Sequence, residues 1–291
     1  MNNNILKKHY PLVPAFLILI FLLTVPSVAV HKSPIFKVST SNRISMADLV
    51  QELKGVRIVT VGEQHDNREH HEMQLNVIRA LHERGLNVAI GFEQFGVRSQ
   101  PHLNDWVSGK AGIQELFEAY SMDWELNWWP WYQPIFLYAR EHELPMVGLN
   151  VPREIVRQVA RSGFGSLSEE QRGKIRVLSC NVDQRYQDAL ARVLGHKGKD
   201  GSDSLLFTRF CEAQVVWDTS MALNAIDFVK VNPNTILVIL AGNFHAWKQG
   251  IPEQIKRNSN ITVRSILPLT DTSFFNYDVF LEEADYVLGM P

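Results

Sequence analysis

The stretch at residues 56–65 constrains the fold more than any other part of this 291-residue chain. It reads Val-Arg-Ile-Val-Thr-Val-Gly-Glu-Gln-His: a β-branched run that predicts a buried strand, then Gly62 and the polar residues Glu63 and His65. A helical pattern begins at about Asn67. Strand, glycine turn and helix in this order build parallel α/β sheets, which bind ligands beyond the carboxyl ends of their strands. Glu63 and His65 are therefore expected at a binding site.

Four further segments predict strands: 87–93, 144–150, 235–241 and 261–267, and 285–288 is expected as an edge strand. Residues 30–43 are interpreted as a polar lead-in without strands. Residues 153–231 have long helical periodicities and are interpreted as a helical insertion or cap within one domain that covers residues 30–291. The expected fold is α/β, with a mostly parallel central sheet flanked by helices.

The helix after His65 has clear start and stop signals. Asp66 is expected as its N-cap, and Gly85 as its stop. The spacing of His70 relative to the apolar positions directs it toward the core, whereas His71 is expected nearer the edge of the helix.

Polar side chains end four of the predicted strands: Glu63 with His65, Glu93, Asn150 and His245. Parallel strands bring these ends to one edge of the sheet. Glu63, His65, Glu93 and His245 are candidate ligands of Zn, Mn, Co or Fe, and equally candidates for acid–base catalysis. They could also hydrogen-bond the acid groups of a ligand. The alternative is structural, with carboxylates that cap helices and histidines satisfied within a polar core.

Four of the seven tryptophans lie within residues 124–132. They either pack the helical cap onto the sheet or line an apolar pocket for an aromatic or porphyrin-like ligand. In the second case the candidate iron ligands are Tyr132, Tyr138, Tyr186 and His196. Arg153, Arg157 and Arg161 form a stripe that could pair with propionates; the alternative is a solvated helix face.

The first 29 residues are typical of a secretory signal peptide: Lys7 and Lys8, an apolar run at 11–26, and small residues at 27–29. This predicts a location outside the cytosol, either periplasmic or secreted. The alternative is an uncleaved signal anchor, which would be the sole membrane contact. Cys180 and Cys211 could pair or be two small buried residues.

The net charge of −2 does not indicate a surface that binds nucleic acid. No Gly-x-Ser-x-Gly elbow is present, so a serine nucleophile is not supported.

The chain resembles the ChaN-like haem-binding uptake proteins of the Tiki/TraB/erythromycin-esterase superfamily. The resemblance rests on the segments 62–66, 150–153, 213–218, 221–222, 241–245 and 250–252, together with His70, His71, Gln74, Glu93, Trp124, Trp128 and Tyr132. It implies an α/β core with a helical portion, secretion to the periplasm and a role in haem or iron uptake. Carried over by position, the superfamily site is Glu63, His65, Glu93 and His245. Many ChaN-like proteins look like lipoproteins, whereas this chain has no cysteine before Cys180.

Two functions follow as hypotheses. The first is a secreted or periplasmic protein that binds haem or another apolar small molecule, with a homodimer as one possible assembly. Its candidate haem-binding residues are Tyr132, Arg153, Asn150 and His70. The second is a divalent-metal-dependent hydrolase of the peptidase or esterase type. In it, Glu63, His65, Glu93 and His245 are both the metal ligands and the catalytic residues.

Overall fold

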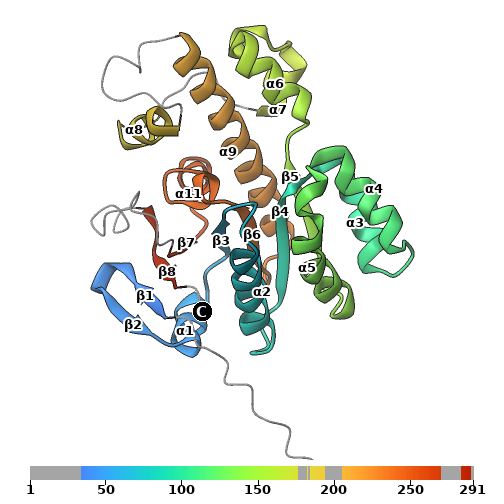
Figure 1. Ribbon diagram of the computed structural model, residues 1–291, viewed down its shortest axis with the longest axis vertical. Coiled ribbons are helices and arrows are strands. Elements are labelled where there is room, and N and C mark those ends of the chain that lie inside the picture. Colours follow the sequence, from blue (N-terminus) through green and yellow to red (C-terminus); the bar gives the residue numbers. More distant parts are fainter. Residues whose placement is uncertain (1–33, 176–181, 183, 194–204, 270–282, 290–291) are drawn as a thin grey trace, which may run out of the picture. The chain divides into compact units, whose positions relative to one another are not determined.

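The structure is a computed structural model that describes residues 34–175, 182, 184–193, 205–269 and 283–289. Their strands form an eight-stranded sheet in the order β2-β1-β8-β7-β3-β6-β4-β5 (Figure 1). The strands are β1 Ile35–Lys37, β2 Asn42–Ile44, β3 Ile58–Glu63, β4 Val88–Gly96, β5 Met146–Asn150, β6 Ile236–Gly242, β7 Val263–Pro268 and β8 Tyr286–Leu288.

The six strands from β8 to β5 run parallel, and β1 pairs antiparallel with both of its neighbours, β8 and β2. This confirms the predicted, mostly parallel α/β sheet. Two details of the prediction are wrong. Strand β8 lies between β7 and β1 and is not an edge strand, and residues 35–44 form strands instead of a plain lead-in. At three residues each, β1 and β2 are too short to show the alternation that identifies a strand in sequence.

Helices cover both faces of the sheet. The α-helices are α1 Met46–Leu53, α2 Arg68–His82, α3 Gln100–Val107, α4 Ile113–Asp123, α5 Trp129–Glu141, α6 Arg153–Ser162, α7 Glu169–Ile175, α8 Gln184–Val193, α9 Leu205–Val231, α10 Asn243–Ala246 and α11 Ile251–Asn258. Short 3-10 helices are η1 Val38–Thr40, η2 Val97–Ser99, η3 Leu126–Trp128 and η4 Phe164–Ser166.

The core is divided by the sheet. Buried residues of α1 to α5 pack with Val59, Val61 and Ile90 on one face. Buried residues of α9 and α11 pack with Ile58 and Ile239 on the other (Figure 1). Successive residues of β3 therefore contribute to opposite cores, which explains why every residue of this strand is buried.

The described residues of the segment 153–231 are helical apart from short connections. Helices α6 and α7 pack against α9, and the second half of α9 packs directly on the sheet. Within the described residues, no helix is long and apolar enough to span a membrane. The predicted signal peptide, Cys180 and His196 lie outside the described residues, and Cys211 is buried on α9.

The start of α2 differs from the sequence prediction. Asn67, not Asp66, is the N-cap, and its side chain accepts hydrogen bonds from the backbone N–H groups of Glu69 and His70. The cap satisfies two of the free donors at the helix start. His70 is buried as predicted, but His71 is buried too, at 2% exposure, so its predicted place at the edge is wrong. Both histidines therefore enter the interior beside the end of β3.

Candidate functional site

Three neighbouring strands carry the candidate site. Glu63 is the last residue of β3, Glu93 lies within β4, and β6 runs between them and ends at Gly242. His65 lies in the loop after β3, and His245 lies in α10, directly after β6. Because β6 pairs in parallel with both neighbours, its end meets theirs at one edge. The predicted convergence of polar strand ends thus has a simple topological cause.

Glu63 joins His65 to a buried tyrosine. Its Oε1 lies 2.5 Å from His65 Nδ1 and accepts a hydrogen bond of 2.8 Å from the Tyr132 hydroxyl. Gln94 Nε2 donates to that hydroxyl at 2.8 Å. The other oxygen, Glu63 Oε2, is buried with no hydrogen bond and lies 3.6 Å from His71 Nε2. An unused buried carboxylate oxygen is free to accept a cation.

Glu93 and His245 form the second half of the site. Glu93 Oε2 accepts a hydrogen bond of 2.7 Å from the backbone N–H of Gly242, and Glu93 Oε1 lies 3.5 Å from His245 Nε2. On its other side, His245 Nδ1 lies 2.6 Å from Asp218 Oδ1. The Tyr186 hydroxyl donates to Asp218 Oδ2 at 2.8 Å. A buried chain of polar groups therefore runs from α8 through α9 to the strand ends.

The two halves meet over Gly242. A Cβ atom at Gly242 would lie 3.2 Å from His65 Cε1 and 3.8 Å from Glu93 Oε2. Ligand atoms of Glu63, His65 and Glu93 lie within 4.8 Å of one another. His245 reaches this group only through Glu93. Mixed carboxylate oxygen and imidazole nitrogen donors in this arrangement suit a divalent ion such as Zn²⁺, Mn²⁺ or Fe²⁺.

The carboxylates favour the charged form of both site histidines. Burial alone would lower the pKa of His65, but the hydrogen bond to Glu63 and the charges of Glu93 and Glu63 outweigh it and raise the pKa to about 9. Burial likewise opposes charge on His245, yet Glu93 and Asp218 raise its pKa above the usual value. A cation that binds at His65 must therefore displace a proton.

The two histidines in the first turn of α2 behave in the opposite way. Burial lowers the pKa of His70 to about 4, although the charge of Glu63 opposes this. The backbone N–H of Gln64 donates to His70 Nδ1 at 2.9 Å, so that nitrogen carries no proton. Burial also lowers the pKa of His71. His70 and His71 are therefore neutral groups that shape the loop holding His65, and His71 Nε2 contacts the His65 carbonyl oxygen at 3.2 Å.

The other predicted haem-binding residues occupy different surroundings. Asn150 is 4% exposed, and its side chain donates to the Glu93 carbonyl oxygen at 2.8 Å, so it links β5 to β4. Tyr132 is fully buried beneath Glu63. Tyr138 lies near the far end of α5, and Tyr186 bonds to Asp218. Arg153 is half-buried at the start of α6 and has no hydrogen bond or ion pair with any described residue.

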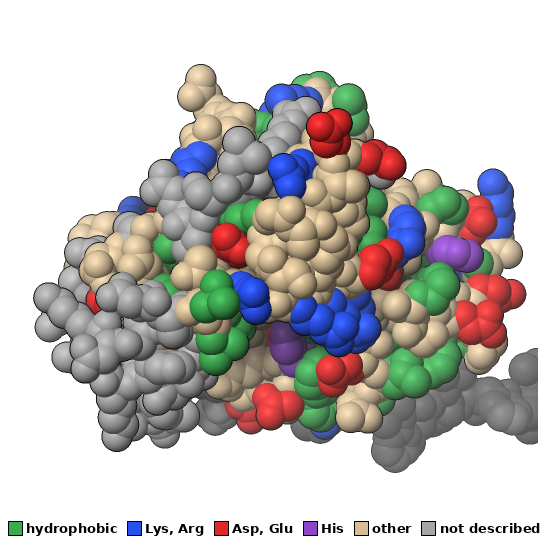
Figure 2. Space-filling model, turned by 90° about the horizontal axis from the view of Figure 1, so that it is seen from above, with side chains coloured by type: hydrophobic (Ala, Val, Ile, Leu, Met, Phe, Trp, Pro, Cys, Tyr) green, Lys and Arg blue, Asp and Glu red, His purple; other side chains and the backbone are tan. Residues whose placement is uncertain are grey.

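The tryptophans of residues 124–132 lie in two different surroundings. Trp129 packs against Tyr120 and Phe136 in the core. Trp124 and Trp128 instead contact the His65 ring, with centroids 5.2 and 5.0 Å away. The side chain of His65 keeps 30% of its surface exposed. Figure 2 looks onto this end of the molecule, where histidine and Lys or Arg side chains gather beside a hollow.

Asp218 is the main site residue that the sequence prediction did not assign. It is 1% exposed, and burial raises its pKa, although His245 opposes the shift. An acid within the apolar run of α9 is the signal that could have identified it, because a buried carboxylate requires a partner. Its partner, His245, lies 27 residues away on α10, and only the fold brings them together.

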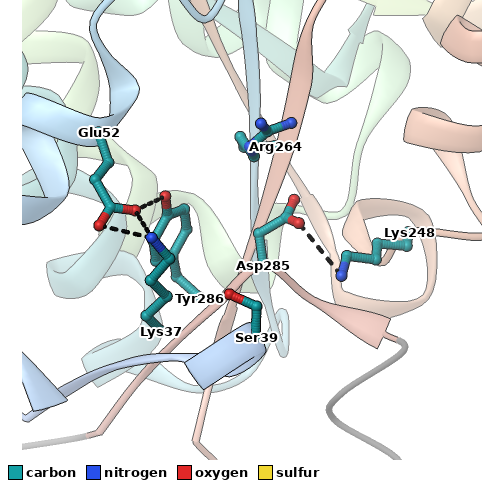
Figure 3. A pocket seen from close by; sticks show the side chains of 7 residues that line it. All are labelled: Lys37, Ser39, Glu52, Lys248, Arg264, Asp285 and Tyr286. Carbon is teal, nitrogen blue, oxygen red and sulfur yellow. Dashed lines mark hydrogen bonds and ion pairs between the residues drawn. The ribbon is translucent and has the colours of Figure 1, made fainter. Parts of the chain in front are cut away.

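A separate cavity of about 530 Å³ lies beside β7 and β8 (Figure 3). Two ion pairs line it: Lys37 with Glu52, and Lys248 with Asp285. Its remaining lining residues are Ser39, Arg264 and Tyr286. This charged lining is unlike the mostly apolar surroundings that a porphyrin ring requires. The cavity therefore does not provide the pocket expected for haem.

Comparison with known proteins supports this fold. A solved structure described as cofacial haem binding to ChaN of Campylobacter jejuni matches with a TM-score of 0.69 and 21% identity, over 90% of this chain and 98% of that one. A mutant of the erythromycin esterase EreC in its open conformation matches with a TM-score of 0.48 and 19% identity, over 81% of this chain and 76% of that one. The first likeness shows a shared fold.

A curated relative covers less of the chain. The chloroplastic protein RETICULATA-RELATED 5 of Arabidopsis thaliana is 27% identical over 128 residues, which make up 42% of this chain and 17% of the plant protein. This chain thus matches less than a fifth of that relative. Residues 49–255 match the family described as haem-binding uptake, Tiki superfamily, ChaN, and the match contains Glu63, His65, Glu93 and His245. The chain therefore belongs to the ChaN family of haem-binding uptake proteins.

Proposed function

We propose that this protein binds haem at the carboxyl ends of β3, β6 and β4, with His65 as the iron ligand. Family membership supports haem as the ligand. The observation that carries the placement is the environment of His65, a partly exposed imidazole in contact with two tryptophan rings. Haem needs an iron ligand beside an aromatic or apolar surface, and this histidine meets both requirements.

The carboxylate of Glu63 prepares His65 for this role. It engages Nδ1 and leaves Nε2 as the second ring nitrogen. A carboxylate bonded to a ligating histidine fixes the orientation of the ring and raises its basicity. The described tyrosines offer no competing surface ligand, because Tyr120, Tyr132, Tyr138, Tyr186 and Tyr286 are all buried.

Arg153 would bind a haem propionate. It follows the end of β5 directly, and no described residue neutralises its charge. Arginine pairs well with carboxylates because its planar group donates two parallel hydrogen bonds. Arg157, one helical turn further along α6, is exposed and extends the positive surface.

A haemin titration of the purified chain tests this proposal. We expect a Soret band with a defined end point, and we expect His65→Ala to weaken haem binding at least about tenfold through loss of the iron ligand. Arg153→Gln should weaken binding less and leave the Soret position unchanged, because it removes only a propionate contact. The exposed His102 on α3 provides a matched control. If His65→Ala and His102→Ala bind haemin equally well, His65 is not the ligand.

A role in uptake and a location outside the cytosol form the wider part of this proposal. The signal-like pattern of residues 1–29 supports export. Cell fractionation of the tagged full chain, with and without residues 1–29, measures the location directly. Growth on haem as the iron source, in cells that lack the chain, measures the uptake role. Normal growth of those cells would contradict uptake while leaving haem binding intact.

A second candidate is a divalent-metal-dependent hydrolase. It is favoured by the grouping of Glu63, His65 and Glu93 ligand atoms within 4.8 Å and by the unused Glu63 Oε2. A divalent ion there would supply Lewis acidity toward a carbonyl group. His245, held by Asp218 and facing Glu93, could hold and return a proton at Nε2.

Metal analysis distinguishes the two functions. A hydrolase of this kind requires about one divalent ion per chain, and Glu93→Gln should abolish both the bound metal and any ester or peptide hydrolysis. Haem binding through His65 should survive Glu93→Gln in substantial part. Hydrolysis that persists after complete removal of metal would exclude the second candidate.

A further inference from the structure

A cluster of three rings lies at the end of α2 and α5. His82 is the last residue of α2, His142 follows the last residue of α5, and Tyr138 lies one turn before it. The ring centroids of His82 and His142 are 4.9 Å apart, and those of Tyr138 and His142 are 4.3 Å apart. Two imidazoles from different helices thus lie side by side at the surface.

This cluster is separate from the strand-end site. Helix α2 starts beside the carboxyl end of β3 and runs back along the sheet, and α5 leads into the start of β5 (Figure 1). His82 therefore lies about 20 Å from the start of α2, at a rise of about 1.5 Å per residue.

Hydrogen bonding orients one of the two histidines. His82 Nδ1 lies 2.9 Å from the Tyr138 hydroxyl, which leaves Nε2 as the second nitrogen. Tyr138 is itself fixed, since it is buried and the guanidinium of Arg79 lies 5.2 Å from its ring centroid. Histidines that bind metal ions commonly hold their other nitrogen in this way. His142 is exposed and has no carboxylate within ion-pair distance among the described residues.

We propose that His82 and His142 together bind a borderline divalent transition-metal ion such as Cu²⁺ or Zn²⁺, with Tyr138 as the positioning residue. Two imidazole nitrogens are the donors that these ions favour.

The electrostatic surroundings favour a cation. Both histidines lie at helix C-termini, where the free carbonyl groups carry partial negative charge. The charges of Glu83 and Glu141 act on Tyr138 and contribute, after burial, to raising its pKa. Among the neighbouring arginines, Arg79 lies over the Tyr138 ring and opposes this effect. Arg84 and Arg140 are engaged elsewhere, since Arg84 donates to the Ala80 carbonyl and Arg140 to that of Ala111.

The test uses the full chain carrying His65→Ala, which weakens the strand-end site. We expect sub-stoichiometric Cu²⁺ to give an electron paramagnetic resonance spectrum with coupling to two imidazole nitrogens. His82→Asn and His142→Asn should each remove one nitrogen coupling and weaken Zn²⁺ binding, measured by calorimetry, at least about tenfold. Tyr138→Phe should weaken Zn²⁺ binding but keep the two-nitrogen spectrum.

The control is His102→Asn, which removes an exposed histidine from α3 and should change neither readout. Circular dichroism and the melting temperature of each variant confirm that the helices remain folded. The proposal is overturned if the two-nitrogen spectrum persists in His82→Asn or His142→Asn, or if His102→Asn reduces it equally. An unchanged Zn²⁺ affinity in Tyr138→Phe would remove the positioning role.

Discussion

At the scale of single residues, the site depends on a buried acid that never touches the surface. Asp218 accepts from Tyr186 and pairs with His245, and all three are nearly inaccessible. Removing the charge of such a carboxylate leaves His245 next to Glu93 alone and a tyrosine with a poorer acceptor. A protein loses several kcal/mol of folding stability when one member of a buried charge network is removed.

Asp218→Asn should therefore destabilise the protein by about 2–4 kcal/mol in urea-induced unfolding. Asp227→Asn is the matched control, because Asp227 lies on the same helix but is exposed and has no partner among the described residues. That change should stay within about 0.5 kcal/mol of the parent. Equal effects of the two variants would show that the Asp218–His245 contact contributes no stability.

Gly242 is a second residue with a specific consequence. An added Cβ would approach His65 Cε1 to 3.2 Å, closer than most real contacts, so the partly exposed ring that contacts Trp124 and Trp128 must shift by a few tenths of an ångström. We expect Gly242→Ala to weaken haem binding several-fold while changing stability by less than about 1 kcal/mol. Gly173→Ala, at a position with open space, should leave haem binding unchanged.

At the scale of elements, α2 carries histidines at both proposed sites. His70 and His71 lie beside the strand-end site, and His82 belongs to the proposed metal site at the other end of the helix. Its N-cap, Asn67, accepts from two backbone N–H groups. Asn67→Ala should lower stability by about 1 kcal/mol and increase hydrogen exchange of the first turn, whereas Asn67→Asp should retain the cap. Normal protection of the Glu69 and His70 amides in Asn67→Ala would contradict a capping role.

At the scale of the whole molecule, His70 makes the free energy of unfolding fall at acid pH. Its folded pKa of about 4 lies below the unfolded value near 6.5, so the unfolded state takes up the proton first. The neutral form stabilises the fold fully above pH 6.5, and this contribution of at most about 3 kcal/mol is lost as the pH falls toward 4. His70→Gln should reduce the loss of stability between pH 7 and pH 4.5, measured by urea unfolding at each pH. An unchanged pH slope would exclude His70 as its source.

Much of this molecule could be predicted from the sequence because its strands are buried on both faces. Continuous apolar runs ending in glycine or polar residues identified β3, β4, β5, β6 and β7, and their parallel pairing placed Glu63, Glu93 and His245 together. Other features could not be predicted. Strands of three residues carry no periodic signal. The contact between Asp218 and His245 depends on how α9 packs. The choice of Asn67 over Asp66 as cap is a matter of one residue, which pattern alone does not resolve.

The central position of β6 also determines when the site can exist. Glu63 and Glu93 are made early in synthesis, but the backbone N–H that holds Glu93 comes from Gly242, 149 residues later. Until β6 leaves the ribosome and inserts between β3 and β4, two carboxylates face an unfilled gap in the sheet. Contacts this distant in sequence form late in folding. A nascent chain that ends before β6 and α10 therefore holds no complete strand-end site, so ligand loading must follow synthesis of these two elements.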